Sequence, residues 1–217
     1  MPEILTEIEA RVVGALIEKE LTTPEYYPLT LNALVAACNQ KTNREPVVSY
    51  DEQIVQKSLD DLREKNLAYV FYGSTSRVPK YKHILDKFLE LERSEISLLC
   101  VLLLRGAQTL GELRGRTDRL YDFSGLGEVQ ETLDNLMRRD EPLVARLERQ
   151  PGQKEVRYAH LLSGEIDVAV YAKEVSSSSV KQADNERIAT LETELENLRS
   201  EFNLFRQSFE EFKKQFE

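Results

Sequence analysis

The chain has 217 residues, of which 41% are hydrophobic and 31% are charged, and its formal net charge at pH 7 is −9. This length has room for two small domains and an extension, and the hydrophobic fraction suits globular folding. The acidic balance argues against a protein that coats nucleic acid indiscriminately. Residues 1–92 sum to −4 and residues 93–165 to −1, so a basic surface in the second stretch must be a local patch.

Targeting and cysteine patterns predict a cytoplasmic protein. The N-terminus lacks the basic and then apolar pattern of a signal peptide, and the longest apolar run, 96–104, is far too short to span a bilayer. Cys38 and Cys100 form no CxxC pair, which favours buried free thiols over a disulfide framework or a thiolate metal site. We therefore expect no metal, no cofactor and no membrane partner.

Three short helices are predicted at the start of the chain, each opened by a capping residue: Thr6, Thr30 and Ser49. The first and third begin with capping boxes, because Glu9 and Glu52 follow three residues after the hydroxyl. A loop with two prolines, 21–28, separates the first two helices. A polar connector, 39–46, precedes the third.

Two strands joined by a tight turn are predicted next. The runs 67–72 and 77–85 contain aromatic and β-branched residues, and the turn residues 73–76 lie between them. Three helices followed by a β-hairpin form the order of a winged helix-turn-helix domain.

The same order then recurs, together with parts of the sequence. The run VQKSLDDL at 55–62 returns as VQETLDNL at 129–136, and YKHIL at 81–85 returns as YAHLL at 158–162. Two ordered matches at similar separations indicate that one unit was duplicated. The second copy is predicted to contain helices near 93–105, 109–117 and 126–139 and strands at 143–147 and 155–162.

The predicted fold is mainly α with small β-hairpins: two tandem winged helix-turn-helix domains plus a C-terminal coiled-coil helix. The expected parts are a first winged-helix domain at 1–90, a second at 91–165, a linker at 166–180 and the coiled-coil helix at 181–217. The linker assignment follows from four consecutive serines at 176–179.

Two stretches resemble the bacterial YceH family. The segments LTLNAL at 29–34 and CNQKTNREPV at 38–47 are similar to one family motif, and ELRGRTDRL at 112–120 is similar to its second-domain motif. The likeness covers roughly residues 3–165, and the C-terminal stretch lies outside it. The resemblance implies a tandem winged-helix fold, no established enzyme chemistry and no catalytic residues.

Winged helices that bind DNA place the third helix in the major groove and the hairpin against the backbone or minor groove. The candidate DNA-contacting residues of the first copy are Lys41, Asn43, Arg44, Gln53, Lys57, Arg77, Lys80 and Lys82. Acidic residues oppose this assignment, because residues 51–65, which include the third helix, sum to −2.

The second copy offers the stronger patch, because its candidates are mostly arginines, whose planar fork makes paired bonds to phosphate and guanine. These residues are Arg114, Arg116, Arg119, Arg146, Arg149 and Lys154. The alternative is that these arginines cap helix ends or pair with Asp118, Asp122 or Glu148.

For several other polar residues, a structural role is an alternative to a functional one. The connector residues 39–44 either read bases or satisfy loop backbone, and both readings remain open. His83 and His160 occupy the same place in the two hairpins, so duplication explains them without metal or proton chemistry. The sequence has no paired carboxylates, nucleophile elbow or phosphate-binding loop, so we expect no enzyme.

The C-terminal stretch carries an apolar heptad stripe of nine residues: Ile188, Leu191, Leu195, Leu198, Phe202, Phe205, Phe209, Phe212 and Phe216. In a parallel, in-register pair, the flanking charges face opposite charges, such as Glu194 with Arg199 and Glu201 with Arg206. We therefore expect a parallel homodimer through 188–216. The bulky phenylalanines leave open a trimer, another protein's groove, or folding back onto the same chain.

The sequence as a whole predicts a non-enzymatic protein that dimerises and associates with DNA, with transcriptional regulation as one possible role. The alternative is a protein–protein adaptor whose winged-helix domains do not bind DNA, by analogy with bacterial chromosome-segregation scaffold proteins. The acidic third helix of the first copy favours the adaptor, and the arginines of the second copy favour DNA.

Overall fold

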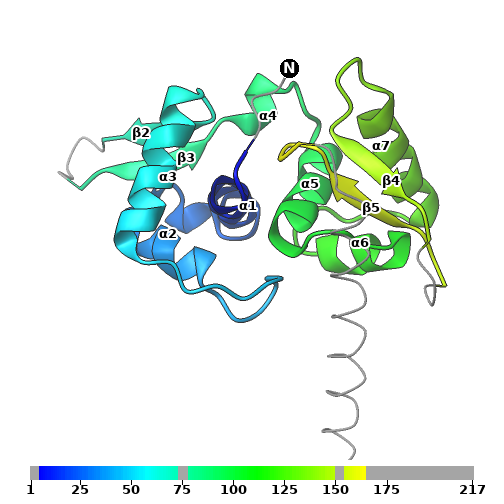
Figure 1. Ribbon diagram of the computed structural model, residues 1–217, viewed down its shortest axis with the longest axis horizontal. Coiled ribbons are helices and arrows are strands. Elements are labelled where there is room, and N and C mark those ends of the chain that lie inside the picture. Colours follow the sequence, from blue (N-terminus) through cyan, green and yellow to red (C-terminus); the bar gives the residue numbers. More distant parts are fainter. Residues whose placement is uncertain (1–4, 73–77, 150–153, 165–217) are drawn as a thin grey trace, which may run out of the picture. The chain divides into compact units, whose positions relative to one another are not determined.

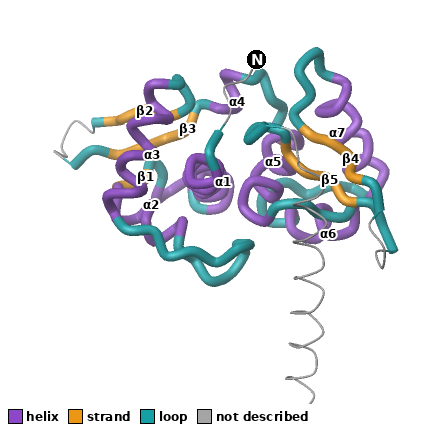
Figure 2. Tube along the Cα trace, viewed as in Figure 1, coloured by secondary structure: helices purple, strands orange, loops and turns teal. Residues whose placement is uncertain are grey.

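A computed structural model of the chain describes residues 5–72, 78–149 and 154–164. This part of the chain is mainly helical and contains small antiparallel strand pairs (Figures 1 and 2). The predicted linker at 166–180 and coiled-coil helix at 181–217 lie outside the described residues. No helix in the described ranges is long and apolar enough to cross a membrane.

The first copy contains the predicted helices and hairpin, together with three short elements that the sequence did not indicate. Its elements are α1 (Glu7–Thr22), η1 (Pro24–Tyr26), β1 (Leu29–Thr30), α2 (Leu31–Cys38), α3 (Glu52–Glu64), β2 (Ala68–Phe71), β3 (Lys80–His83) and α4 (Leu85–Phe88). The capping predictions for Thr6 and Thr30 are confirmed, because their hydroxyls accept hydrogen bonds from the backbone of Glu9 and Ala33. The prediction for Ser49 is wrong. Asp51 caps α3 instead, since its carboxylate accepts from the Ile54 backbone at 2.8 Å.

The second copy follows the prediction closely. Its elements are α5 (Arg93–Arg105), α6 (Leu110–Thr117), α7 (Leu126–Arg138), β4 (Val144–Leu147) and β5 (Arg157–His160). Thr109 and Glu112 form a capping box at the start of α6, with reciprocal hydrogen bonds of 3.2 and 2.8 Å.

A hydrogen-bonded trio recurs in the two copies. The hydroxyl of Tyr81 donates to Oε1 of Gln56 at 3.2 Å, and the Gln56 amide donates to Asp60 at 3.1 Å. In the second copy Tyr158 donates to Gln130 at 2.9 Å, and Gln130 donates to Asp134 at 2.8 Å. The trio ties the returning strand of each hairpin to the third helix, so the duplication extends to side-chain contacts.

The strand pairings are equivalent too. In the first copy the strand order is β1-β3-β2, with Leu29 paired opposite Tyr81. In the second copy β4 pairs with β5, and an isolated bridge joins Gln108 to Tyr158. Leu29 and Gln108 each precede the threonine that caps the next helix, so the bridge is a shortened counterpart of β1.

The two copies share one core, with α1 packed against α5 (Figure 1). Both helices are buried on all sides over ten residues, Glu9–Glu18 and Glu95–Leu104. Gly14 permits the close approach, because a Cβ there would come within 2.9 Å of Leu104.

Cys38 and Cys100 are buried free thiols, as predicted, and Cys100 lies 3.5 Å from the Gly14 carbonyl. Whether 1–90 and 91–165 are separate folding domains stays a prediction.

Candidate functional site

The basic residues of α3 are engaged by acids of the same helix. Lys57 Nζ lies 2.7 Å from Asp61, and Arg63 lies 3.0 Å from Asp60. Gln53 and Lys57 are exposed, as a DNA-reading face requires. The helix nevertheless carries four acids and two bases, a sum of −2. Both bases of α3 are therefore paired with acids of the same helix, and the helix surface is net acidic.

The equivalent helix of the second copy has the same character. Arg138 is the only base of α7 and lies 3.3 Å from Asp134, while Glu128 and Glu131 add two more acids, so the helix also sums to −2. A helix inserted into the major groove runs between two phosphate backbones, where net negative charge is repelled. Neither third helix has the charge of a recognition helix.

Arg44 lies in the interior, with its side chain fully buried. Its guanidinium donates to both carboxylate oxygens of Glu18, at 2.9 and 2.7 Å, and to the carbonyl of Ala37. Burial alone would raise the pKa of Glu18, but the hydrogen bonds and charge of Arg44 outweigh it and lower that pKa. The sequence placed Arg44 among the DNA contacts. The structure instead makes it a buried anchor of the connector, unavailable to a phosphate.

The rest of the connector combines anchored and exposed residues. The Asn39 amide exchanges two hydrogen bonds of 2.8 Å with the backbone of Tyr50. Asn43 has a left-handed φ of 60° and accepts a hydrogen bond from the guanidinium of Arg105. Lys41 is exposed. Asn39 and Arg44 therefore bond to the protein's own backbone, as the structural alternative predicts, whereas the exposed Lys41 is accessible to a ligand.

The solvent face of the first hairpin combines aromatic and basic residues. Tyr69 pairs opposite Lys82 and Phe71 opposite Lys80, so all four point to the same face. Tyr69 and Phe71 are 59% and 47% exposed, while the other face of the hairpin packs on the core. Arg77, which the sequence placed with Lys80 and Lys82, lies outside the described residues.

In the second copy, most of the candidate residues are exposed and lack an acidic partner. Within the described ranges, no carboxylate pairs with Arg114, Arg119, Arg146, Arg149 or Lys154, and the predicted alternative partners Asp118, Asp122 and Glu148 engage none of them. Arg116 differs, because it lies 3.5 Å from Glu112. Glu112 also accepts a 2.8 Å hydrogen bond from Arg157 of β5, which ties the hairpin to α6.

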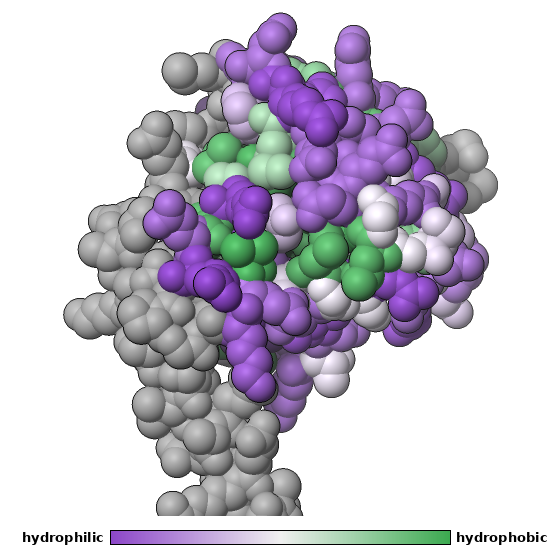
Figure 3. Space-filling view, turned by 90° about the vertical axis from the view of Figure 1, so that its right-hand side faces the viewer, coloured by the Kyte–Doolittle hydropathy of each residue, from purple (hydrophilic) through white to green (hydrophobic). Residues whose placement is uncertain are grey.

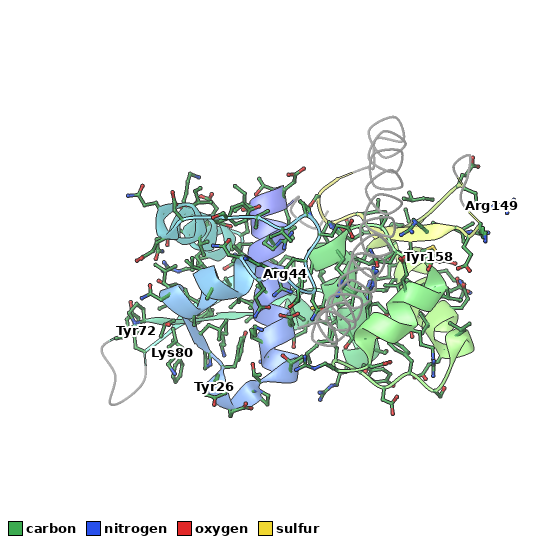
Figure 4. The ribbon with its side chains drawn as sticks, turned by 90° about the horizontal axis from the view of Figure 1, so that it is seen from below. Tyr26, Arg44, Tyr72, Lys80, Arg149 and Tyr158 are labelled. Atoms are coloured by element: carbon green, nitrogen blue, oxygen red, sulfur yellow. The ribbon has the colours of Figure 1, made fainter. Side chains whose placement is uncertain are left out.

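The two hairpins lie at opposite ends of the described unit. Figure 4 shows Tyr72 and Lys80 at one end, Arg149 at the other, and Arg44 beside α1 in the middle. Figure 1 likewise shows β2 and β3 on one side of the described unit and β4 and β5 on the other. The face of the second copy in Figure 3 is mostly hydrophilic, with the apolar colour confined to small areas near its centre.

The histidines occupy equivalent strand positions but differ in their surroundings. His83 lies 2.5 Å from Glu20 of α1, a partner for which the sequence held no signal. Burial lowers the pKa of His160 to about 4, so its ring is neutral at physiological pH. The His83 side chain is almost enclosed by protein and the Nδ1 atom of His160 is buried, in keeping with the structural role expected for both residues.

A cavity of about 370 Å³ lies between the two copies. It brings together three residues that the sequence assigned to DNA, Asn43, Arg116 and Arg119, from segments far apart in the chain. Lys19 and Arg105 also line it, and sequence reasoning missed both. A basic residue in the last turn of a helix is common, since it complements the helix dipole, so neither position stood out.

Comparisons with known proteins match the chain over the described residues and beyond. The family described as "Protein of unknown function, DUF480" matches residues 5–153. A UPF0502 protein of Geobacter sulfurreducens is 49% identical over 220 residues, and one of Pelobacter propionicus is 50% identical over 221, each alignment covering the whole of both chains. A UPF0502 protein of Opitutus terrae is 57% identical over 167 residues, covering 76% of this chain and 73% of its own. The chain therefore belongs to the DUF480 family and is similar throughout its length to bacterial UPF0502 proteins.

Proposed function

We propose that the chain is a non-enzymatic, tandem winged-helix protein that associates with the DNA backbone, chiefly through its second hairpin. Each copy has the order helix, short strand or bridge, helix, helix and hairpin, which supports the winged-helix identity. The resemblance to the YceH family belongs to this proposal.

The observation that carries the proposal is the contrast in charge pairing. Arg146, Arg149 and Lys154 of the second hairpin are exposed and have no acidic partner in the described part of the chain. The basic residues of both third helices are already paired with acids on the same helix. A phosphate gains most from a cation that has no competing carboxylate, so the hairpin is the better phosphate ligand.

This arrangement supports backbone contact without insertion of a third helix. Contacts to phosphates hold a protein on the duplex but carry no sequence information directly. We therefore propose binding with weak sequence preference and strong salt dependence. The coiled-coil homodimer through 188–216 would bring two such hairpins to one duplex and raise the avidity.

The test compares two triple variants that remove the same charge. In Arg146→Ala/Arg149→Ala/Lys154→Ala the hairpin loses its basic residues; in Lys57→Ala/Arg63→Ala/Arg138→Ala the third helices lose theirs. Fluorescence anisotropy of a labelled duplex should show at least about a tenfold loss of affinity for the hairpin variant at low salt. The third-helix variant should bind like the wild type.

The opposite ranking would contradict this mode of binding. If the third-helix variant lost affinity and the hairpin variant kept it, the third helices would be the DNA-contacting elements. Equal losses would show that binding reports overall charge alone, which would remove the hairpin from the interface.

A second candidate function, a protein–protein adaptor, is favoured by the exposed aromatic edge of the first copy. The strand β2 lies at the edge of its sheet, and Tyr69, Phe71 and Tyr72 are 47–69% exposed there. Exposed aromatic residues on an unpaired strand edge are typical of surfaces that bind another protein. Absence of DNA binding even at low salt would favour this function.

A further inference from the structure

The cavity between the two copies is built from both stretches that resemble family motifs. The connector contributes Thr42 and Asn43, the end of α6 contributes Arg116, and the turn after α6 contributes Arg119. The central helices close the cavity, with Lys19 of α1 and Arg105 of α5 at its wall. Because the copies share one core, these segments are held together as part of the fold.

The cavity wall carries more positive than negative charge. The cations at the wall are Lys19, Arg105, Arg116 and Arg119, and the carboxylates are Glu18 and Asp118, so four positive charges face two negative ones. Glu18 is neutralised from behind by the buried guanidinium of Arg44, at 2.7 Å. Glu18 also lies 3.3 Å from Lys19 of the same wall, so the positive charge open to a ligand rests mainly on the three arginines.

The guanidinium groups keep hydrogen-bond donors available for a ligand. Among the described residues, Arg119 has no acidic partner, and the guanidinium of Arg105 donates its one hydrogen bond to the amide oxygen of Asn43. Arg116 lies 3.5 Å from Glu112, which is engaged more closely by Arg157. Arginine presents five N–H donors in a planar fork, which suits bidentate contact with carboxylate or phosphate.

The neighbouring charges destabilise one another in the absence of an anion. Burial and the charge of Arg116 lower the pKa of Arg105, while Glu45 acts in the opposite direction. An anion between Arg105 and Arg116 would remove this repulsion. The volume of about 370 Å³ is at the lower end of the range for small-molecule sites, which fits a compact polar ligand.

We propose that this cavity binds a small, multiply charged oxyanion, a phosphate-bearing or polycarboxylate metabolite held by Arg105, Arg116 and Arg119. The hydroxyl of Thr42 and the amide of Asn43 supply further polar contacts at the wall. The inference goes beyond DNA association and does not depend on it, since the hairpin residues Arg146, Arg149 and Lys154 do not line the cavity.

Isothermal titration calorimetry tests the proposal. The full-length chain is titrated with pyrophosphate and, separately, with citrate, at constant ionic strength. Wild-type protein should bind at least one of the two saturably, with one ligand per chain. The double variant Arg105→Gln/Arg119→Gln should weaken binding at least about tenfold, because two charge-assisted contacts are removed. The matched control Arg146→Gln/Arg149→Gln removes the same charge from the same copy and should stay within about twofold of the wild type.

The single variant Arg119→Gln distinguishes a loss of ligand contacts from a loss of folding. Arg119 is exposed and has no partner in the described ranges, so this variant should keep the wild-type melting temperature and still lose affinity several-fold. Tighter binding of pyrophosphate would assign a phosphate-bearing ligand, and tighter binding of citrate a polycarboxylate. Failure of the wild type to bind either anion, or equal losses in the cavity and control variants, would overturn the proposal.

Discussion

The guanidinium of Arg44 and the carboxylate of Glu18 form a two-pronged pair, with N–O distances of 2.9 and 2.7 Å. Arg44 comes from the connector and Glu18 from the central helix α1, so the pair anchors an irregular loop to the core. A residue that the sequence offered as a DNA contact is thus part of what holds the connector in place.

Replacing Arg44 with Ala should destabilise the protein by about 3 to 5 kcal/mol, because the mostly buried Glu18 loses its bidentate partner. Urea denaturation followed by circular dichroism measures this change. The matched control is Arg63→Ala, which breaks an exposed pair with Asp60 and should cost less than about 1 kcal/mol. If Arg44→Ala lost DNA affinity but kept the stability of the wild type, Arg44 would be a DNA-contacting residue after all.

Mild acid should destabilise the protein through His160. The unfolded imidazole takes up a proton below a pKa of about 6.5, whereas burial lowers the folded pKa to about 4. Stability from this group is therefore complete above about pH 6.5 and is lost as the pH falls toward 4. At pH 5 the loss should be about 1 to 2 kcal/mol. His160→Gln should flatten the decline in unfolding free energy between pH 7 and pH 5; an unchanged decline would assign it to other groups.

Gly14 should be sensitive to a single added methyl group. A Cβ at this position would lie 2.9 Å from Leu104 and 3.1 Å from Leu103, so Gly14→Ala should push α1 away from α5 and cost about 1 to 3 kcal/mol. Gly115 is the control, because nothing lies within 4 Å of its Cβ position in helix α6. Gly115→Ala should stabilise by up to about 1 kcal/mol through helix propensity. Equal melting temperatures for the two variants would contradict the close helix contact.

The proposed tail dimer can be separated from general helix effects by changing opposite faces. Leu195→Asp/Leu198→Asp places charges on the apolar stripe and should yield monomers by light scattering. Thr193→Asp/Ser200→Asp places the same charges on the outer heptad positions and should leave dimers. Wild-type protein that is already monomeric would end the dimer proposal.

Much of the fold could be predicted because the sequence motifs of the first copy recur in the second. The positions of Gln56 and Gln130, and of Tyr81 and Tyr158, were visible as repeated motifs, and each pair makes the same hydrogen bond. Strand β1 was not predictable, since two residues carry no period of their own and depend on pairing with β3.

The candidate site was less predictable because burial and pairing depend on tertiary contacts. Nothing in the sequence near Arg44 distinguishes a buried anchor from an exposed phosphate ligand, since its partner Glu18 lies far back in the chain. Lys57 also read as a DNA contact, although the acid that engages it, Asp61, lies four residues on at helical spacing. That spacing was a usable signal.

The salt dependence of DNA binding by the wild-type, full-length chain tests the central proposal most directly. Anisotropy of a labelled random-sequence duplex should rise with protein concentration at low salt, and the affinity should fall steeply toward physiological salt as phosphate contacts release counterions. Removing Arg146, Arg149 and Lys154 should reduce the slope of log affinity against log salt by about 2 to 3. No binding at low salt, or an unchanged slope in that variant, would contradict phosphate contact by the second hairpin.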